Sequence, residues 1–254
     1  MSVTALVTGA SAGFGTAIAR RFVRDGHRVI TAARRADRLR ALREELGDRL
    51  HPIALDVTDA GAIAALLSDL PQGWREVDVL INNAGLALGL DPLHRTSIEE
   101  LDRMVATNVL GLLHLTRALL PGMVERNRGH VVNVGSVAGS YPYPGGHVYG
   151  ASKAFVKQLT LNLKADLAGT NVRASNIEPG LVGGTEFSQV RFHGDAERAA
   201  RIYEGTQALS ADDIAEAVAW VVNLPPHVNI NRLEIMPTCQ GPGPMVIKRE
   251  STAA

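Results

Sequence analysis

Cysteine is almost absent from this sequence, and neither sign of charge is in excess. The only cysteine is Cys239, which excludes an intrachain disulfide and a zinc site built from clustered cysteines. A chain without disulfides fits a reducing compartment, although some secreted proteins also lack them. Lysine and arginine together number 26, as do aspartate and glutamate, so the charge balance gives no sign of a surface for nucleic acid or for a membrane.

Long hydrophobic runs are missing as well. No apolar run approaches the ~20 residues that a bilayer-spanning helix needs. The first residues, MSVTALVTG, lack the basic start and the small-residue cleavage site of a signal peptide, so they are predicted to form a strand. We therefore expect no membrane partner and a cytoplasmic location.

Short apolar runs rich in β-branched residues alternate with longer segments of helical period. This alternation predicts an α/β fold with a doubly wound parallel sheet of about seven strands and helices on both faces. Runs such as VDVLI and HVVNV are nearly continuously apolar, as expected for strands buried on both sides. The strands are expected at Val3–Val7, Arg28–Ala33, Pro52–Leu55, Val77–Ile81, His130–Val134, Val172–Ile177 and Leu233–Met236. The helices are expected at Thr16–Arg24, Asp37–Leu46, Ile63–Leu70, Ile98–Leu119, Tyr149–Leu167 and Asp212–Asn223.

Two segments break this alternation. Residues 180–209 are polar and contain glycine, which predicts an insertion that forms a lid over a substrate site. The tail, 237–254, contains Gly241, Pro242, Gly243 and Pro244 and is expected to be irregular. Length alone allows two small domains, but no linker, repeat or low-complexity tract is present, so residues 1–254 are expected to form a single domain.

A glycine-rich turn follows the first expected strand. Residues 8–15 read TGASAGFG, with the spacing T-G-x-x-x-G-x-G. Glycines at such a turn let the backbone approach a pyrophosphate closely, and the next helix offers N–H groups and the positive end of its dipole. A tight strand–helix turn without a ligand would also use glycines, but the position after the first strand and before an amphipathic helix favours a dinucleotide.

The end of the second expected strand distinguishes NAD from NADP. An acidic residue there binds the ribose hydroxyls and repels a 2′-phosphate. This sequence has Arg34 and Arg35 instead, and guanidiniums bind phosphate well, so NADP(H) is predicted. The alternative is a solvated basic start to the next helix. Asp56, after the third strand, either meets the adenine amino group or caps a helix.

Polar residues also gather after the fourth and fifth expected strands. The segment Asn82–Gly85 follows one strand and Ser136 the next, and Tyr149 and Lys153 are four apart in a helical segment, so these two share a helix face. Open parallel sheets bind ligands at this edge.

These residue types suit proton transfer. A phenol has a pKa of about 10, and a nearby ammonium lowers it, so Tyr149 beside Lys153 is a candidate proton donor or acceptor. Ser136 would hydrogen-bond the substrate oxygen as charge develops there. Each feature alone is explained by a surface pair or an ordinary turn, but their joint occurrence in this order favours a catalytic centre.

Taken together, the motifs resemble those of the short-chain dehydrogenase/reductase family over essentially the full length. The resemblance implies a Rossmann-type fold, no metal, Tyr149 as the acid/base, and a Lys153 that lowers its pKa and binds the nicotinamide ribose. It further implies that Ser136 orients the carbonyl and that Asn108 holds a water in a proton relay. The matching motifs are TGASAGFG at 8–15, NNAG at 82–85, Asn108, Ser136, the Y-x-x-x-K of Tyr149–Lys153, and Pro179-Gly180.

The same resemblance implies a set of cofactor residues. Thr185 matches a threonine that touches the nicotinamide carboxamide, although its distance in sequence from Pro179-Gly180 is longer here than in many members. The residues expected to bind NADP(H) are Gly9, Ser11, Gly13, Phe14, Gly15, Arg34, Arg35, Asp56, Val57, Asn83, Ala84, Gly85, Tyr149, Lys153, Pro179, Gly180, Val182 and Thr185.

Within the family, segments such as GLALGLDPLH and IEPGLVGGTEFSQVRFHGD resemble the bacterial NADP-dependent 3-hydroxy acid dehydrogenases, also called serine or L-allo-threonine dehydrogenases, and the sulfoacetaldehyde reductases. Both groups act on small anions, which makes a hydroxy acid, an oxo acid or a sulfonate the expected substrate. Arg191, in the segment Glu186–Phe192, is the candidate clamp for that anion, and a structural ion pair is the alternative. His147, two residues before Tyr149, is expected to face the substrate together with Ser136 and Tyr149.

The predicted reaction is hydride transfer between NADP(H) and a small 3-hydroxy acid or its oxo form. One rival is a sulfoacetaldehyde reductase, and another is an idle NADP-binding regulator, against which the intact Ser136, Tyr149 and Lys153 argue. A cofactor-free lyase such as a halohydrin dehalogenase would replace the lysine and lose the glycine-rich turn. The resemblance also implies a homotetramer with Ile98–Leu119 and Tyr149–Leu167 as interfaces.

Overall fold

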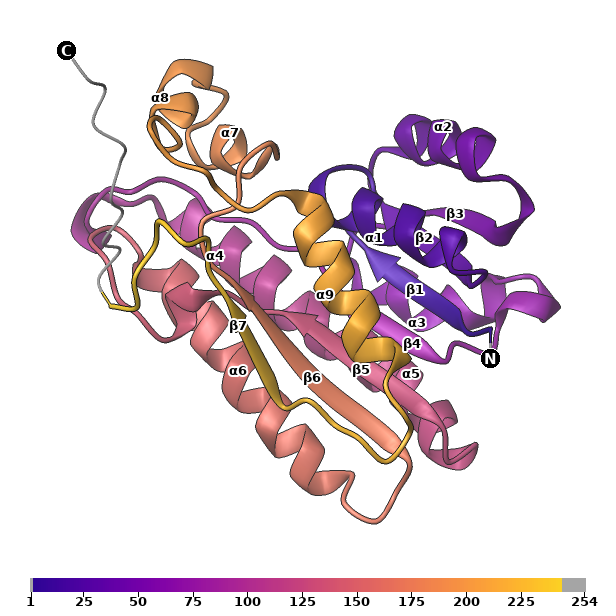
Figure 1. Ribbon diagram of the computed structural model, residues 1–254. Coiled ribbons are helices and arrows are strands. Elements are labelled where there is room, and N and C mark those ends of the chain that lie inside the picture. The colour runs from indigo at the N-terminus through magenta and orange to yellow at the C-terminus, as the bar shows by residue number, and fades with distance from the viewer. Residues whose placement is uncertain (1, 244–254) are drawn as a thin grey trace.

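The structure, a computed structural model, describes residues 2–243. Its centre is one parallel sheet with the strand order β3-β2-β1-β4-β5-β6-β7 (Figure 1). The chain winds outward from β1 to β3, crosses to β4 on the other side of β1, and then winds to β7. The predicted doubly wound Rossmann-type sheet is therefore confirmed. The strands are β1 (Thr4–Thr8), β2 (Arg28–Ala33), β3 (Leu50–Ala54), β4 (Val79–Asn82), β5 (Gly129–Val134), β6 (Val172–Pro179) and β7 (Arg232–Ile235).

Helices cover both faces of this sheet, and each face has its own apolar core. Helices α1, α2 and α9 pack on one face, and α3, α5 and α6 pack on the other. The central strands β1 and β4 are buried along their whole length, which explains their nearly continuous apolar sequences. The helices are α1 (Gly13–Arg24), α2 (Ala36–Leu46), α3 (Ala60–Asp69), α4 (Ile98–Val105), α5 (Leu112–Glu125), α6 (His147–Asp166), α7 (Phe187–Arg191), α8 (Ala196–Arg201) and α9 (Ala211–Asn223).

The long helix expected at Ile98–Leu119 has a more complex form. It runs from Ile98 to Glu125 and contains a π-helical stretch at Ala106–Gly111 between α4 and α5. Gly111 lies so close to the loop after β3 that an added Cβ would be 2.6 Å from the carbonyl oxygen of Val57. The π-helical stretch thus brings the helix against the sheet edge that carries the site.

This same helix, Ile98–Glu125, is the one element among residues 2–243 with the length and apolar composition of a membrane-spanning helix. Its apolar side chains have another explanation in the structure. Leu115, Leu119 and Met123 are almost fully buried in the core between the sheet and the helices α3 and α6.

The predicted lid segment, residues 180–209, contains the short helices α7 and α8 and lies over the sheet edge next to the N-terminus of α9 (Figure 1). An isolated parallel bridge between Val182 and Leu209 joins the two ends of the segment. Of the tail predicted to be irregular, 237–254, the residues up to 243 form turns and bends, and 244–254 lie outside the described residues. The side chain of Gln240 accepts a hydrogen bond from the backbone of Leu181, 2.7 Å away, so the tail packs on the base of the lid segment.

Candidate active site

A cavity of about 640 Å³ lies along the carboxyl ends of the strands, under the lid segment. Such a volume suits a dinucleotide and a small second ligand. The cavity runs from the glycine-rich turn to the N-terminal part of α6. Most of the predicted site residues line it: Gly9, Ser11, Gly13, Phe14, Arg34, Arg35, Asp56, Val57, Asn83, Ala84, Gly85, Ser136, Tyr149, Lys153, Pro179, Gly180, Val182, Thr185 and Arg191.

The three glycines of the turn have different physical roles. Gly9 and Gly13 have φ values of 64° and 52°, in the left-handed region that glycine adopts without strain. Gly15 does not line the cavity; an added Cβ there would be 2.5 Å from the carbonyl oxygen of Gly9, so this glycine lets α1 pack closely on the turn. The prediction that Gly15 contacts the cofactor is corrected to a packing role, which leaves the start of α1 at the edge of the cavity.

Two arginines, Arg34 and Arg35, and two carboxylates, Asp56 and Glu186, line the cofactor end of the cavity. Arg34 lines it and forms no hydrogen bond or ion pair within the described part of the chain, whereas the Nε of Arg35 donates to the hydroxyl of Ser11 at 3.1 Å. Asp56 accepts from the backbone and hydroxyl of Thr58 at 2.9 and 2.8 Å. Asp59 is the residue that caps α3, so the helix-cap alternative for Asp56 does not apply.

These features fit the adenosine end of a dinucleotide that carries a 2′-phosphate. Glycines permit close approach of the backbone, and a helix N-terminus and a free guanidinium face the same cavity. No carboxylate follows β2, where an NAD-binding site would place one.

At the other end of the cavity, α6 and the loop after β5 bring the chemical groups together. The Ser136 hydroxyl accepts a hydrogen bond from the backbone N–H of Ala138 at 3.1 Å and lies beside the phenol of Tyr149. Lys153, one turn along α6 from Tyr149, donates from Nζ to the carbonyl oxygen of Val134 at 2.7 Å. The sequence-predicted residues Ser136, Tyr149 and Lys153 therefore line the same cavity.

The electrostatics of this trio differ from the expectation. Burial raises the pKa of Tyr149, and the groups that oppose this rise are the Arg191 guanidinium and the Ser136 hydroxyl. Burial lowers the pKa of Lys153 to about 8. The Lys153 ammonium lies 5.8 Å from the centre of the Tyr149 ring and is bound to a carbonyl instead, so the predicted lowering of the Tyr149 pKa by Lys153 is not seen in this structure.

Arg191 is a second cation beside the Tyr149 ring. Its guanidinium carbon lies 5.3 Å from the centre of the Tyr149 ring and 4.9 Å from that of Phe187, and Nη2 donates to the hydroxyl of Tyr143 at 3.0 Å. The side chain is buried, yet its Nε has no hydrogen-bond partner. No carboxylate pairs with Arg191 within residues 2–243, which removes the structural ion pair as an explanation for this arginine.

Besides Gly15, two predicted residues do not line the cavity. His147 is turned away, because its Nε2 hydrogen-bonds the Thr96 hydroxyl and the carbonyl oxygen of Asp91 at 3.1 and 3.0 Å. The prediction that His147 faces the substrate is therefore wrong in this structure. The side-chain amide of Asn108 pairs with both backbone groups of Leu86 at 2.9 Å. A relay water at Asn108 would bind either this side-chain oxygen or the backbone carbonyl, which lies in the π-helical stretch.

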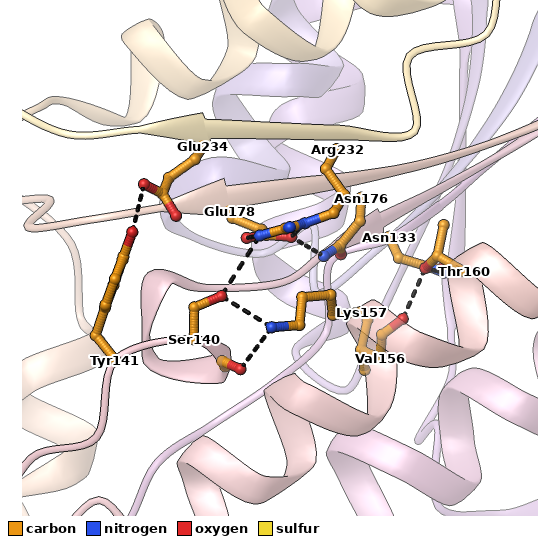
Figure 2. A network of polar contacts seen from close by, with 11 residues as sticks. Asn133, Ser140, Tyr141, Val156, Lys157, Thr160, Asn176, Glu178, Arg232 and Glu234 are labelled. Atoms are coloured by element: carbon orange, nitrogen blue, oxygen red, sulfur yellow. Dashed lines mark hydrogen bonds and ion pairs between the residues drawn. The ribbon is translucent and has the colours of Figure 1, made fainter. Parts of the chain in front are cut away.

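Behind the Ser136 loop lies a network of polar contacts that the sequence did not reveal. Figure 2 shows Lys157 of α6 donating to the Ser140 hydroxyl at 2.9 Å and to the carbonyl oxygen of Gly139 at 3.0 Å. Arg232 of β7 donates hydrogen bonds from Nε and Nη2 to the fully buried carboxylate of Glu178 in β6, at 2.7 and 2.8 Å. Its Nη2 also donates to the hydroxyl of Ser140 at 3.4 Å. The loop after Ser136 is thus hydrogen-bonded to α6 and to β7, and β7 is in turn ion-paired with β6.

Aromatic residues of the cavity were also missed. The chain has two tryptophans, four tyrosines and five phenylalanines, and five of these aromatic side chains line this one cavity. Phe14 and Tyr149 were predicted, while Tyr143, Phe187 and Tyr203 were not. Concentration of a scarce residue type near a lid and a catalytic segment is the one sequence signal that would have pointed to them.

Comparison with known proteins places this site in a family. The family described as short chain dehydrogenase matches residues 3–196, more than half of the chain. The chain belongs to this family, so the predicted class of enzyme, an oxidoreductase acting on CH–OH groups, is confirmed.

Individual relatives are similar over nearly the whole chain. The NADP-dependent 3-hydroxy acid dehydrogenase YdfG of Salmonella typhi is 60% identical over 235 residues, 92% of this chain and 95% of that one. The serine 3-dehydrogenase of Agrobacterium fabrum is 49% identical over 251 residues, 99% of this chain and 100% of that one. A solved structure described as the closed form of serine dehydrogenase complexed with NADP+ matches with a TM-score of 0.94 at 55% identity, covering 97% of this chain and 100% of that one.

Proposed function

We propose that this protein is an NADP(H)-dependent dehydrogenase that interconverts a small 3-hydroxy acid and its oxo form. The observation that carries the proposal is the buried Arg191, whose unpartnered Nε lies in the cavity wall beside the Tyr149 ring. A buried cation without a carboxylate partner is costly unless a ligand supplies the anion. A carboxylate two carbons from the reacting hydroxyl carbon is short enough to meet Arg191 while the hydroxyl meets Tyr149. The names of the relatives, 3-hydroxy acid and serine dehydrogenases, support the same substrate class.

The proposed groups for proton transfer are the hydroxyls of Tyr149 and Ser136. The Ser136 hydroxyl lies beside the Tyr149 phenol, so both hydroxyls can contact one substrate oxygen. During oxidation the substrate hydroxyl gives its proton to the Tyr149 oxygen, and during reduction the proton returns. NADP(H), when bound, supplies or accepts the hydride at the carbon.

Lys153 has two roles in this proposal. Its Nζ donates a hydrogen bond to the carbonyl oxygen of Val134 at 2.7 Å, which positions the end of β5 just before Ser136. Its pKa of about 8 lets the amine exchange a proton near neutral pH, and the resemblance to the family adds a bond to the nicotinamide ribose. Asn108, through its backbone carbonyl, is the proposed holder of the water that follows Lys153 in the proton relay.

The proposed cofactor residues contact different parts of NADP(H). The glycine-rich turn, with Ser11 and Phe14, would hold the pyrophosphate, and Arg34 and Arg35 would hold the 2′-phosphate. Asp56 and Val57 with Asn83, Ala84 and Gly85 would hold the adenosine side. Pro179, Gly180, Val182 and Thr185 would hold the nicotinamide.

A second candidate function uses the same site. Arg191 binds a sulfonate as well as a carboxylate, so reduction of sulfoacetaldehyde to isethionate fits the cavity without any change of mechanism. The idle-regulator alternative is disfavoured by the intact contact between Ser136 and Tyr149.

The expected assembly is a homotetramer in the cytoplasm. Apolar side chains on the proposed interface helices are exposed in the single chain, including Ile98 at 65%, Leu110 at 45% and Phe155 at 39%. Burial of these side chains against other subunits would remove that apolar surface from water. Light scattering at micromolar concentration tests this, and a monomer would contradict it; cell fractionation tests the location.

The experiment that tests the function is NADP+ reduction with a panel of serine, 3-hydroxypropionate, 3-hydroxyisobutyrate and isethionate. Tyr149→Phe is the control, because it keeps the ring and removes the proton acceptor. We expect turnover of a 3-hydroxy acid that is lost in the control. Preference for isethionate would select the sulfonate alternative, and NADPH binding without any turnover would leave the idle regulator.

A further inference from the structure

One ion-pair cluster joins the lid segment to the cofactor end of the cavity. It centres on Glu186, which stands between two residues of the cavity wall. Thr185 lies against the glycine-rich turn, because a Cβ added to Gly13 would touch it at 3.4 Å. The Phe187 ring lies 5.6 Å from that of Tyr149. Because Glu186 is joined to both neighbours in the chain, a shift of Glu186 moves Thr185 beside the glycine-rich turn and Phe187 beside Tyr149.

The carboxylate of Glu186 reaches across to the segment after β2. Its Oε1 pairs with Nη1 of Arg38 at 2.6 Å, and its Oε2 pairs with Nη1 of Arg35 at 2.8 Å. Each carboxylate oxygen thus has its own guanidinium, and these two ion pairs keep the pKa of Glu186 below its usual range although burial opposes this. Arg35 is further fixed by its bond to Ser11, so a chain of polar contacts runs from the glycine-rich turn to the lid segment.

The two arginines differ in their relation to the cavity. Arg35 lines it, whereas Arg38 does not. A 2′-phosphate that binds Arg34 and Arg35 therefore leaves the pair between Glu186 and Arg38 intact. Glu186 balances the charge of Arg38, so Arg34 and Arg35, next to the carboxylate of Asp56, are the guanidiniums that face a 2′-phosphate of about −1.5 to −2. The cluster can hold the phosphate and the lid segment at the same time.

We propose that Glu186 is a positioning residue that anchors the lid segment to α2 through Arg35 and Arg38, and so fixes Phe187 and Arg191 against the substrate. The part about the substrate rests on the function proposed above. The anchor itself does not, because it can be measured without turnover.

The consequence is a change in substrate KM without loss of the chemical step. The three side chains are between about a third and a half exposed, with relative exposures of 36% for Glu186, 41% for Arg35 and 46% for Arg38. Ion pairs at such exposure are weak, so loss of the anchor corresponds to about a two- to tenfold rise in KM for the acid. The value of kcat stays within about twofold, because Ser136, Tyr149 and Lys153 are untouched.

The test compares Glu186→Gln, Arg38→Met and their double variant with Arg40→Met as the matched control. Arg40 is an exposed arginine of the same helix that forms no ion pair with the lid segment. Three readouts are used: KM and kcat for 3-hydroxypropionate, NADPH affinity by fluorescence, and hydrogen–deuterium exchange of the amides in residues 185–193. Exchange measured with NADPH bound reports the anchor directly and needs no substrate.

We expect both single variants to exchange faster and to raise KM, with Glu186→Gln affected at least as much as Arg38→Met because it loses both ion pairs. The double variant should be no worse than Glu186→Gln, and Arg40→Met should behave as wild type. NADPH affinity should not fall in Arg38→Met. Unchanged exchange, additive effects in the double variant, or faster exchange with an unchanged KM would overturn the proposal. Faster exchange in a protein that oxidises no acid would overturn the proposed function and leave the anchor standing.

Discussion

Replacement of Arg191 by methionine tests the substrate assignment most directly. The substitution keeps an unbranched, apolar stem among Tyr143, Tyr149 and Phe187 and removes only the guanidinium. Within residues 2–243 the Nε has no partner and no carboxylate pairs with this side chain, so the fold loses the hydrogen bond from Nη2 to the Tyr143 hydroxyl and the contacts of the guanidinium with the aromatic rings, but no ion pair. The thermal midpoint should therefore fall only modestly, which circular dichroism can check first.

The expected loss falls on binding of the anion. Hydrogen bonds between two charged partners contribute about 1.5–3 kcal/mol, which corresponds to a fall of about 10- to 150-fold in kcat/KM for 3-hydroxypropionate. The uncharged analogue 3-hydroxypropionamide has almost the same shape and should lose far less. Loss of the Arg191 charge also raises the pKa of Tyr149, but this change affects the acid and the amide alike. The ratio of the two kcat/KM values therefore isolates the carboxylate contact.

The assay is initial-rate NADP+ reduction with both compounds, in wild type, Arg191→Met and Arg191→Lys. The lysine variant keeps the charge without the planar geometry and should recover part of the preference for the acid. Equal losses for the acid and the amide would refute the clamp and leave Arg191 as a residue that only tunes Tyr149.

Three further variants probe other parts of the site. Arg34→Gln should raise the KM for NADP+ by about 10- to 150-fold and leave that for NAD+ nearly unchanged, since a charged hydrogen bond to phosphate contributes about 1.5–3 kcal/mol. Lys153→Met should remove a pH dependence of stability. The pKa of Lys153 is about 8 in the folded protein and 10.5 for the exposed side chain, so between these pH values the unfolded chain binds more protons than the folded protein. Wild type should then gain up to about 3 kcal/mol in the free energy of unfolding, relative to the variant, as pH rises from 8 to 10.5. Arg232→Met leaves Glu178 buried without its cation, so the free energy of unfolding measured in urea should fall by about 3–5 kcal/mol. Arg232→Lys is the control and should lose less. A loss below about 1 kcal/mol in Arg232→Met would contradict this prediction.

The sequence was sufficient for the architecture because local patterns and the global fold agree. The strand Arg28–Ala33 has the predicted bounds, and every other predicted strand ends within two residues of the observed ones. Spacing in the sequence also predicts three local features: the glycine-rich turn, the two arginines after β2, and the pair Tyr149 and Lys153. Each of these motifs can be predicted because its residues lie within a few positions of one another.

What the sequence could not predict depends on contacts between distant segments. The direction of the His147 ring is set by Thr96 and Asp91, about fifty positions earlier in the chain. The pKa of Tyr149 depends on a guanidinium from the lid segment more than on Lys153, its neighbour on the helix. Periodicity places side chains on a helix face but does not determine which partners the lid segment brings to that face.

The proposed contact of Arg191 with the substrate carboxylate, next to the Tyr149 phenol, has a consequence for pH dependence. In the free enzyme, Arg191 opposes the burial that raises the pKa of Tyr149. A bound carboxylate neutralises part of that positive charge, so the pKa of Tyr149 should rise further in the complex. Oxidation requires the phenolate, and the phenolate is lost as pH falls below this pKa.

The acidic limb of kcat, which reports the complex, should therefore lie at higher pH than the limb of kcat/KM, which reports the free enzyme. With 3-hydroxypropionamide the two limbs should nearly coincide, because the amide brings no charge to Arg191. Arg191→Met should abolish the difference for the acid as well. A separation of equal size with the acid and the amide would show that desolvation by the ligand, and not neutralisation of Arg191, shifts the phenol. The same argument implies that an acid ligand holds Tyr149 in its protonated form, which is the form that donates a proton during reduction of the oxo acid.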